Sequence, residues 1–243
     1  MIETEAGLLD EEDLPARQGR VLFAYMVLNR RRPLPRAELA ASVWGDSLPD
    51  ASEASLSVLL SRMRNLFRRF GIDADLEALS GSVHLRLPGE LWVDLDAARN
   101  ALDQAEGLMR RDKLQEAWSD AVVAHSVLER GFLHGEEASW IVRERERIQS
   151  EHLRSLELLA DVSLRLGDPT AAVRFAKLSE EIQPFRESAY EREMRAEMQM
   201  GNRAEALQIY ERLRRLLADE LGADPSSSLQ AVFMEALQGI ESQ

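Results

Sequence analysis

Part of the sequence repeats itself at an interval of 34 residues. Gly167 and Gly201 stand 34 positions apart, and amphipathic helical patterns lie on both sides of each glycine. The same interval relates one alanine pair and five apolar pairs: Ala172 and Ala206, Val173 and Leu207, Phe175 and Ile209, Leu164 and Met198, Leu156 and Tyr190, Ile182 and Leu216. A period of this length indicates helix–turn–helix units, each of which completes its core by stacking on the next.

This repeat lies in a long helical region that begins near Asp94. Breaks containing glycine or proline divide it into predicted helices at residues 95–110, 113–130, 137–166, 169–183, 187–200, 203–221 and 226–240. A helix–Gly–helix unit of 34 residues has the tetratricopeptide spacing. A weaker copy covers Leu102 to Leu128, with Ala117 at the position of the close-packing alanine. We therefore expect an all-α, tetratricopeptide-like domain over residues 93–243.

The first 92 residues follow a different pattern. Helices are predicted at residues 17–29, 35–44 and 52–70, the third capped by Asp50 or Ser52. Apolar Val83, Leu85 and Leu87 then alternate with polar residues, and Ser80-Gly81 supplies a turn, which indicates a β-hairpin. Residues 2–5 favour a further strand. Three helices followed by a hairpin is the order of a winged helix-turn-helix, so the predicted fold class is mainly α, a winged helix followed by the repeat domain.

Charge is distributed unevenly between these two parts. Residues 14–72 contain ten arginines and four acidic residues, a formal charge of +6. The total of −13 therefore leaves −19 for the remainder. Phosphate binding needs positive charge, so only the N-terminal part is suited to nucleic acid, and an acidic remainder would leave that basic face as the one able to dock.

The third predicted helix has one apolar face and one basic face. Leu56, Leu60, Met63, Phe67 and Phe70 form the apolar stripe. A second face carries Ser55, Val58, Arg62, Asn65 and Arg69, flanked by Ser57, Ser61, Arg64 and Arg68, and no acidic residue stands between Ala54 and Gly71. Arginine can contact guanine edges or phosphates, asparagine can read adenine, and serine can bind phosphate. The helix therefore suits a major groove, although a solvated basic face is a common alternative.

Two further basic features lie near this helix. His84 and Arg86 are predicted on the outward face of the hairpin, where Arg86 can reach a minor groove or a phosphate, or be an ordinary exposed residue. Arg30, Arg31 and Arg32 form a cluster that suits phosphate and equally suits the cationic C-terminus of a helix.

Several classes of function are excluded or disfavoured. The sequence contains no cysteine, which rules out disulfides and thiolate metal sites and suits a reducing cytosol. Four histidines are scattered without metal-ligand spacing, and no phosphate-binding glycine loop or nucleophilic serine elbow is present. The start of the chain has no signal-peptide pattern, and the longest uncharged apolar stretch, residues 21–28, is too short to cross a bilayer. We expect a cytoplasmic protein that is not an enzyme and has no cofactor, metal or membrane partner.

Several motifs in both parts of the chain belong together. They are Leu-Pro-Ala-Arg-Gln-Gly-Arg (14–20), Pro-Leu-Pro-Arg-Ala-Glu-Leu-Ala (33–40), Val-Trp-Gly-Asp (43–46), Leu-Leu-Ser-Arg-Met-Arg (59–64), Val-Asp-Leu-Asp-Ala-Ala (93–98), the segment 201–214 and Leu-Ala-Asp-Glu-Leu-Gly-Ala-Asp-Pro-Ser (217–226). With these motifs the chain resembles the Streptomyces antibiotic regulatory protein (SARP) family, which joins an OmpR-like winged helix to a bacterial transcriptional activator domain. The resemblance covers roughly residues 2–238. It places the winged helix at 1–92, with an N-terminal sheet shortened to fit the thirteen residues before Leu14, and the activator domain at 93–243.

The resemblance implies a transcriptional activator. Such proteins bind direct repeats near promoters as paired protomers and recruit RNA polymerase holoenzyme, with the third helix in the major groove. The DNA contacts that follow for this chain are Ser57, Ser61, Arg62, Arg64, Asn65 and Arg68, with Arg36, Arg69 and Arg86 as further candidates. The alternative hypothesis is a protein-interaction adaptor, in which the winged helix no longer binds DNA and the repeat groove holds a partner peptide.

Overall fold

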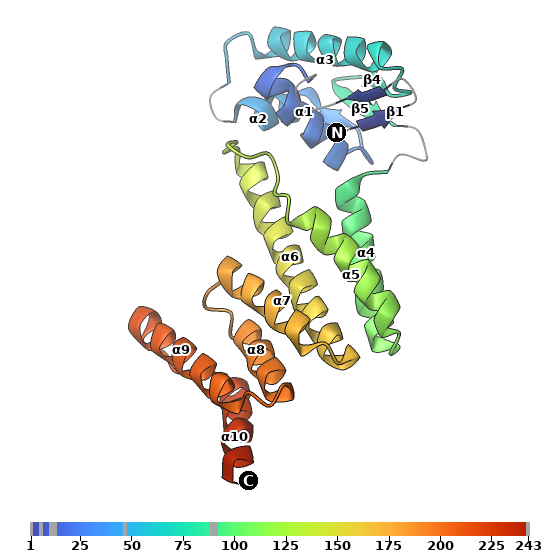
Figure 1. The fold of residues 1–243 in the computed structure, drawn as a ribbon. Helices are drawn as coiled ribbons and strands as arrows, with labels where there is room; N and C mark the ends of the chain where they lie inside the picture. Colours follow the sequence, from blue (N-terminus) through green and yellow to red (C-terminus); the bar gives the residue numbers. More distant parts are fainter. Residues whose placement is uncertain (1, 5–6, 10–13, 46–47, 88–91, 242–243) are drawn as a thin grey trace. The chain divides into compact units, whose positions relative to one another are not determined.

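The computed structural model describes residues 2–4, 7–9, 14–45, 48–87 and 92–241 (Figure 1). Two compact units are present. The first, here called the head, comprises Met1–Trp92 and Phe132–Arg145, and the second, the body, comprises Val93–Gly131 and Glu146–Gln243. The expected exit of the hairpin at Pro88-Gly89 and residues 46–47 of the loop after Gly45 lie outside the described residues.

The head has the elements of a winged helix-turn-helix. Its helices are α1 (Ala16–Leu28), α2 (Arg36–Trp44) and α3 (Ser52–Arg69), within one residue of the predicted starts and ends. Strands β4 (Asp75–Leu79) and β5 (Ser82–Arg86) form the predicted antiparallel hairpin. A third strand, β3 (Leu34–Pro35), pairs with β5, so the sheet order is β3-β5-β4. Strands β1 (Ile2–Thr4) and β2 (Gly7–Leu9) pair separately, and β1 includes the strand expected near residue 2.

The apolar stripe of α3 forms the centre of the head's core. Leu56, Leu60, Met63 and Phe67 are at most 2% exposed, as their spacing predicts, whereas Phe70 is half-buried beyond the end of the helix. The ring of Phe67 meets Phe23 of α1 edge to face at 6.1 Å between centroids. The remaining core side chains come from α1, α2 and the sheet: Leu22, Met26, Leu34, Leu39, Leu76, Val83 and Leu85. Burial of one face of α3 therefore determines which face remains in solvent.

Residues 132–145 pack against the first two helices of the head. The indole nitrogen of Trp140 donates to the backbone oxygen of Ser42 at 2.8 Å, and its ring lies 5.0 Å from that of Tyr25. Arg17 forms an ion pair of 2.8 Å with Glu136, whose side chain is 9% exposed. The predicted boundary at residue 92 assigned this segment to the C-terminal domain, but its contacts belong to the N-terminal unit.

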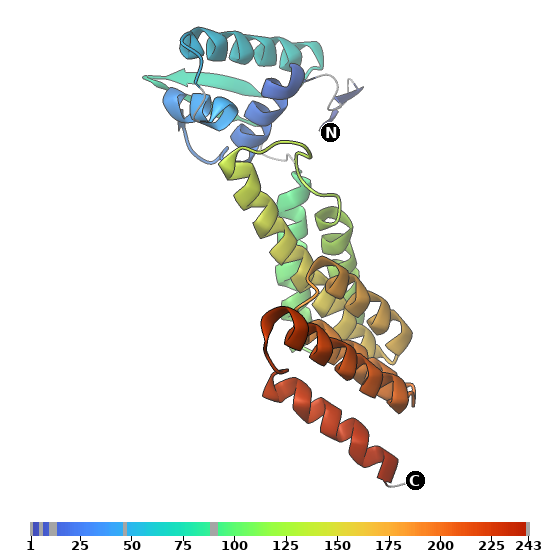
Figure 2. The same ribbon diagram turned by 90° about the vertical axis from the view of Figure 1, so that its left-hand side faces the viewer.

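The body is a succession of helices: α4 (Asp94–Arg110), α5 (Leu114–Leu128), the C-terminal part of α6 (Ser139–Leu166), α7 (Pro169–Ile182), α8 (Glu187–Gln199), α9 (Arg203–Leu221) and α10 (Ser227–Glu241). Contacts join α4 to α5, α7 to α8, α8 to α9 and α9 to α10 (Figure 2). The repeat alanines Ala117, Ala172 and Ala206 are fully buried, as close packing requires. Gly167 and Gly201 adopt positive φ angles of 80° and 84° at the turns between helices, where a side chain would be strained.

A cluster of charged side chains lies between α7, α8 and α9. Arg212 donates to Glu180 at 2.7 Å and to Glu193 at 2.6 Å, and Lys177 approaches Glu193 at 3.4 Å. Glu193 is 2% exposed, and among the described residues the buried Oε1 of Glu180 has no hydrogen-bond partner. Burial, followed by the nearby charge of Glu193, raises the pKa of Glu180 to about 8, against the opposing effect of Arg212.

This raised pKa predicts that stability declines as pH rises from about 4.5 to about 8. The folded protein holds a proton on Glu180 that the unfolded chain releases near its ordinary pKa, so stability declines as pH rises towards 8. We expect the parent to lose on the order of 2 kcal/mol of unfolding free energy from this group between pH 5 and 9. Glu180→Gln keeps the neutral form and should show a smaller decline in urea titrations over this range. Equal declines in the two proteins would contradict the prediction.

Candidate nucleic-acid interface

The solvent face of α3 contains most of the predicted contact residues. Ser57, Ser61, Arg62, Asn65, Arg68 and Arg69 are all exposed, opposite the buried stripe of the same helix. At 100° per residue these positions span an arc of about 140°, so they form one continuous surface. The surface carries three arginines and no carboxylate over α3 from Ala54 onward. Positive potential and hydrogen-bonding side chains are thus presented on one convex helix.

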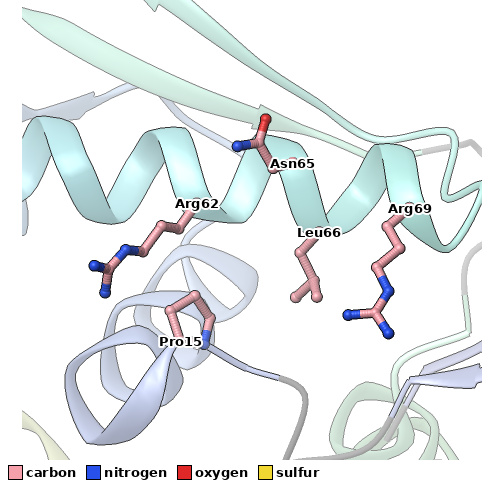
Figure 3. Close-up of a pocket in the computed structure, with 5 residues that line it drawn as sticks. All are labelled: Pro15, Arg62, Asn65, Leu66 and Arg69. Carbon is pink, nitrogen blue, oxygen red and sulfur yellow. The ribbon is translucent and has the colours of Figure 1, made fainter.

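One edge of this surface lies beside the start of α1. Arg62, Leu66 and Arg69 point to the same side of α3 and, with Pro15 and Asn65, line an open depression of about 280 Å³ (Figure 3). Pro15 packs closely against Gly19 of α1. The contact leaves no room for a larger residue at position 19, since a Cβ atom there would stand 2.7 Å from the proline Cδ. Two guanidinium groups at one depression suit an anion such as a phosphate.

The opposite edge lies beside the hairpin and α2. Arg68 donates to the side-chain oxygen of Asn65, which orients that amide. Arg36, at the start of α2, donates to Ser57 Oγ at 2.7 Å and pairs with Glu53 at 2.8 Å. The structure therefore brings Arg36 and Ser57 together, but Glu53 already balances the charge of Arg36.

Arg64 differs from the other predicted contacts on α3. Its side chain is half-buried, and Nη2 donates to the backbone oxygen of Leu76 in β4 at 2.9 Å. This bond connects α3 to the hairpin, so Arg64 is placed to hold the helix on the sheet. The helical spacing in the sequence correctly placed the neighbouring contact residues on the exposed face of α3. It did not show that Arg64 connects the helix to the hairpin.

Of the two hairpin residues predicted to face solvent, Arg86 is exposed and His84 is half-buried. Arg86 is 63% exposed and pairs with Glu77 across the hairpin at 3.0 Å. His84 is half-buried instead of outward, and its Nε2 lies 3.0 Å from the backbone oxygen of Arg30. Arg30 itself donates to the Val27 oxygen at 3.0 Å, which is the interaction expected of a cation at a helix C-terminus.

A histidine pair in the body had no signal in the sequence spacing. His125 Nδ1 and His152 Nε2 lie 2.9 Å apart, with Phe175 against the first ring and Glu129 3.6 Å from its other nitrogen. Burial, then the neighbouring His125, lowers the pKa of His152 to about 4. Burial also lowers the pKa of His125, against the opposing charge of Glu129. Within the part of the chain that the structure describes, no third ligand completes a metal site here.

These lowered pKa values predict a loss of stability in acid. The folded body holds neutral imidazoles, whereas the unfolded chain binds protons near pH 6.5, so stability falls as pH drops from about 6.5 towards 4. His152→Gln removes the titrating ring, and we expect it to lessen this loss by on the order of 2 kcal/mol. Urea unfolding at pH 7.0 and 4.5 would measure the difference. An identical acid loss in parent and variant would refute the assignment.

Comparison with known proteins places the body in a family. The model of the bacterial transcriptional activator domain matches residues 93–237. The chain belongs to this family. The regulatory protein AfsR of Streptomyces coelicolor is 31% identical over 229 residues, which cover 91% of this chain and 22% of AfsR. The transcriptional regulatory protein EmbR of Mycobacterium tuberculosis strain H37Rv is 24% identical over 88% of this chain and 55% of EmbR. The SARP resemblance read from the motifs is thereby confirmed.

A solved structure supports the fold. Mycobacterium tuberculosis EmbR, in complex with a low affinity phosphopeptide, superposes with a TM-score of 0.77 at 20% identity, over 97% of this chain and 61% of that chain. The expected fold class, a winged helix followed by tetratricopeptide-like helices, is therefore confirmed. The chain spans about a fifth of the length of AfsR and about half that of EmbR. None of the helices in the described residues has the length and apolar character to cross a membrane.

Proposed function

We propose that this member of the bacterial transcriptional activator domain family is a sequence-specific, DNA-binding transcriptional regulator. Residues 1–92 form the DNA-binding domain, with α3 in the major groove, and residues 93–243 form the activator domain, whose segment 132–145 packs within the head. The contacts we assign are Ser57, Ser61, Arg62, Asn65, Arg68 and Arg69 on α3, with Arg86 on the hairpin and Arg36 beside Ser57.

One observation carries this proposal, the composition of the exposed face of α3. Arg62, Arg68 and Arg69 stand at its two edges, and the carboxylate nearest the helix start, Glu53, is paired with Arg36. Arginines at the edges of a helix are placed for the phosphates that flank a groove, and small polar residues between them are placed for base edges. The acidic total charge of the chain does not oppose this docking, because its excess lies outside residues 14–72.

The relatives support a role in transcription. AfsR and EmbR are both named regulatory proteins, and this chain matches them over both its head and its body. By the same resemblance we propose an activator that binds repeated promoter sites as a homodimer and recruits RNA polymerase holoenzyme, acting in the cytoplasm without an enzymatic step.

Selection from a pool of random duplexes would test the proposal. The full-length protein should enrich a repeated motif, and its affinity for that motif should fall steeply as salt rises, because bound arginines release counterions from the DNA. A folded protein that enriches no sequence, even at low salt, would refute DNA binding and favour the adaptor hypothesis. Pull-down of RNA polymerase holoenzyme on the selected duplex would test recruitment separately.

A further inference from the structure

One apolar side chain stands in the middle of the basic face of α3. Val58 is 50% exposed, although the other large aliphatic residues of the helix, such as Leu59 and Leu60, are at most 8% exposed. It lies on the solvent side and is therefore not a member of the head's core. An isolated exposed valine is common on protein surfaces, so its position among its neighbours decides what it can do.

Helical geometry places Val58 on the centre line of the exposed face. At 100° per residue, Ala54, Val58, Ser61 and Asn65 fall within about 60° of one another. Arg62 and Arg69 lie to one side of this line, where they line the depression beside Pro15. Ser57 and Arg68 lie to the other side, nearer Arg64, which is tied to β4. The centre line itself carries no charged residue.

This arrangement separates two kinds of contact. Long guanidinium side chains at the edges can reach phosphates on both walls of a groove, whereas short side chains on the centre line approach the floor, where base edges lie. On the floor of the major groove, the C5 methyl of thymine is the apolar group that a base pair presents. Val58 has the chemistry for that methyl group and offers no hydrogen bond to any other base edge.

We propose that Val58 determines specificity by packing against the C5 methyl group of a thymine. This inference rests on the proposed DNA binding through α3. It deepens that proposal, because it assigns one base to one side chain. Ala54, one turn earlier on the same line and also exposed, leaves room for the methyl group to approach Val58.

The geometry also sets the distance to a second base contact. Asn65 lies seven residues beyond Val58, which is about 10 Å along the helix axis. Successive bases in one strand are about 3.4 Å apart along the DNA axis, so the two contacts are at most about three base steps apart. Asn65 suits an adenine, and its amide is oriented by Arg68. The selected motif should therefore contain an essential thymine within about three steps of an essential adenine.

Replacement of thymine by deoxyuridine isolates the methyl group, since the two bases differ in nothing else. The probe is the duplex selected by the full-length parent, with each thymine exchanged singly. We expect one position at which the exchange weakens parent binding about three- to fivefold, the usual effect of losing one buried methyl contact. Val58→Ala should bind the thymine duplex about as weakly and should be insensitive to deoxyuridine at that position, because the lost contact is shared.

Val123 provides a matched control, because it is 48% exposed on α5 in the body. Val123→Ala should retain the parent's affinity and its sensitivity to deoxyuridine. If the duplex is bound but Val58→Ala keeps the parent's sensitivity at every thymine, or no thymine is sensitive in the parent, the assignment of Val58 is overturned while DNA binding stands. If no duplex is enriched, both proposals fall together.

Discussion

Replacing Arg62 and Arg69 together by alanine is expected to weaken binding to the selected duplex about 100-fold at low salt. Both arginines line the same depression beside Pro15, and each contact to a phosphate or a base is worth about 1–3 kcal/mol. Each lost phosphate contact also reduces the slope of log affinity against log salt by about one. Fluorescence anisotropy at several salt concentrations would measure both quantities in the full-length protein.

A matched control for this experiment is Arg111→Ala. Arg111 is exposed at the end of α4 in the body, so the variant removes one arginine without altering the face of α3. Its affinity and salt slope should remain close to those of the parent. If the double variant also retained the parent's salt slope, Arg62 and Arg69 would not be phosphate contacts, and the proposed orientation of α3 would be wrong.

Phe67→Ala is expected to destabilise the head by about 3–5 kcal/mol, because it removes a large side chain from a close-packed core. Phe67 is 2% exposed, and its ring packs edge to face on Phe23. A loss of this size is a large fraction of the stability of an ordinary domain. Hydrogen exchange followed by mass spectrometry should show faster exchange in peptides from residues 14–87.

Two comparisons make this prediction specific. Peptides from residues 146–238 should retain the parent's exchange, because the head and the body have separate cores. Val58→Ala, on the exposed side of the same helix, should change stability by less than about 0.5 kcal/mol. Unchanged exchange in the head of Phe67→Ala would show that the assigned core is not the one that stabilises α3.

Local patterns predicted the helices well, for a physical reason. A helix is specified by its own 3.6-residue periodicity and by the residues that end it. Gly167, Gly201 and Gly222 all adopt positive φ angles at helix ends, and each was a predicted break. The 34-residue interval also identified the buried alanines Ala172 and Ala206, because the tight packing position recurs in each unit.

Short strands were harder to predict. Residues 34–35 were expected to precede or start a helix, yet Leu34 pairs with Val83 and is fully buried. Two residues carry no periodicity of their own, and the pairing depends on a hairpin almost fifty positions away in the sequence. The β4–β5 hairpin was predicted, because its alternation and its Ser80-Gly81 turn are local signals.

In the candidate site, too, local periodicity predicted some features, and contacts with distant segments decided others. Periodicity separated the apolar stripe of α3 from the exposed positions of Ser61, Arg62 and Asn65. It could not separate Arg64 from them, because the partner of Arg64 is a backbone oxygen of β4. For the same reason, alternation placed His84 on the outward face of the hairpin but did not show its contact with the backbone oxygen of Arg30, just beyond the end of α1.

The sequence by itself determined the helices, the β4–β5 hairpin, the buried stripe of α3, the repeat and the uneven charge, since each is recorded in the order and spacing of residues along the chain. Tertiary structure decided which distant groups meet. It packed Trp140 against Tyr25, placed His125 against His152, and gathered Glu180 and Glu193 around Arg212. Such contacts depend on how separate helices cross, and no spacing along the chain records that geometry.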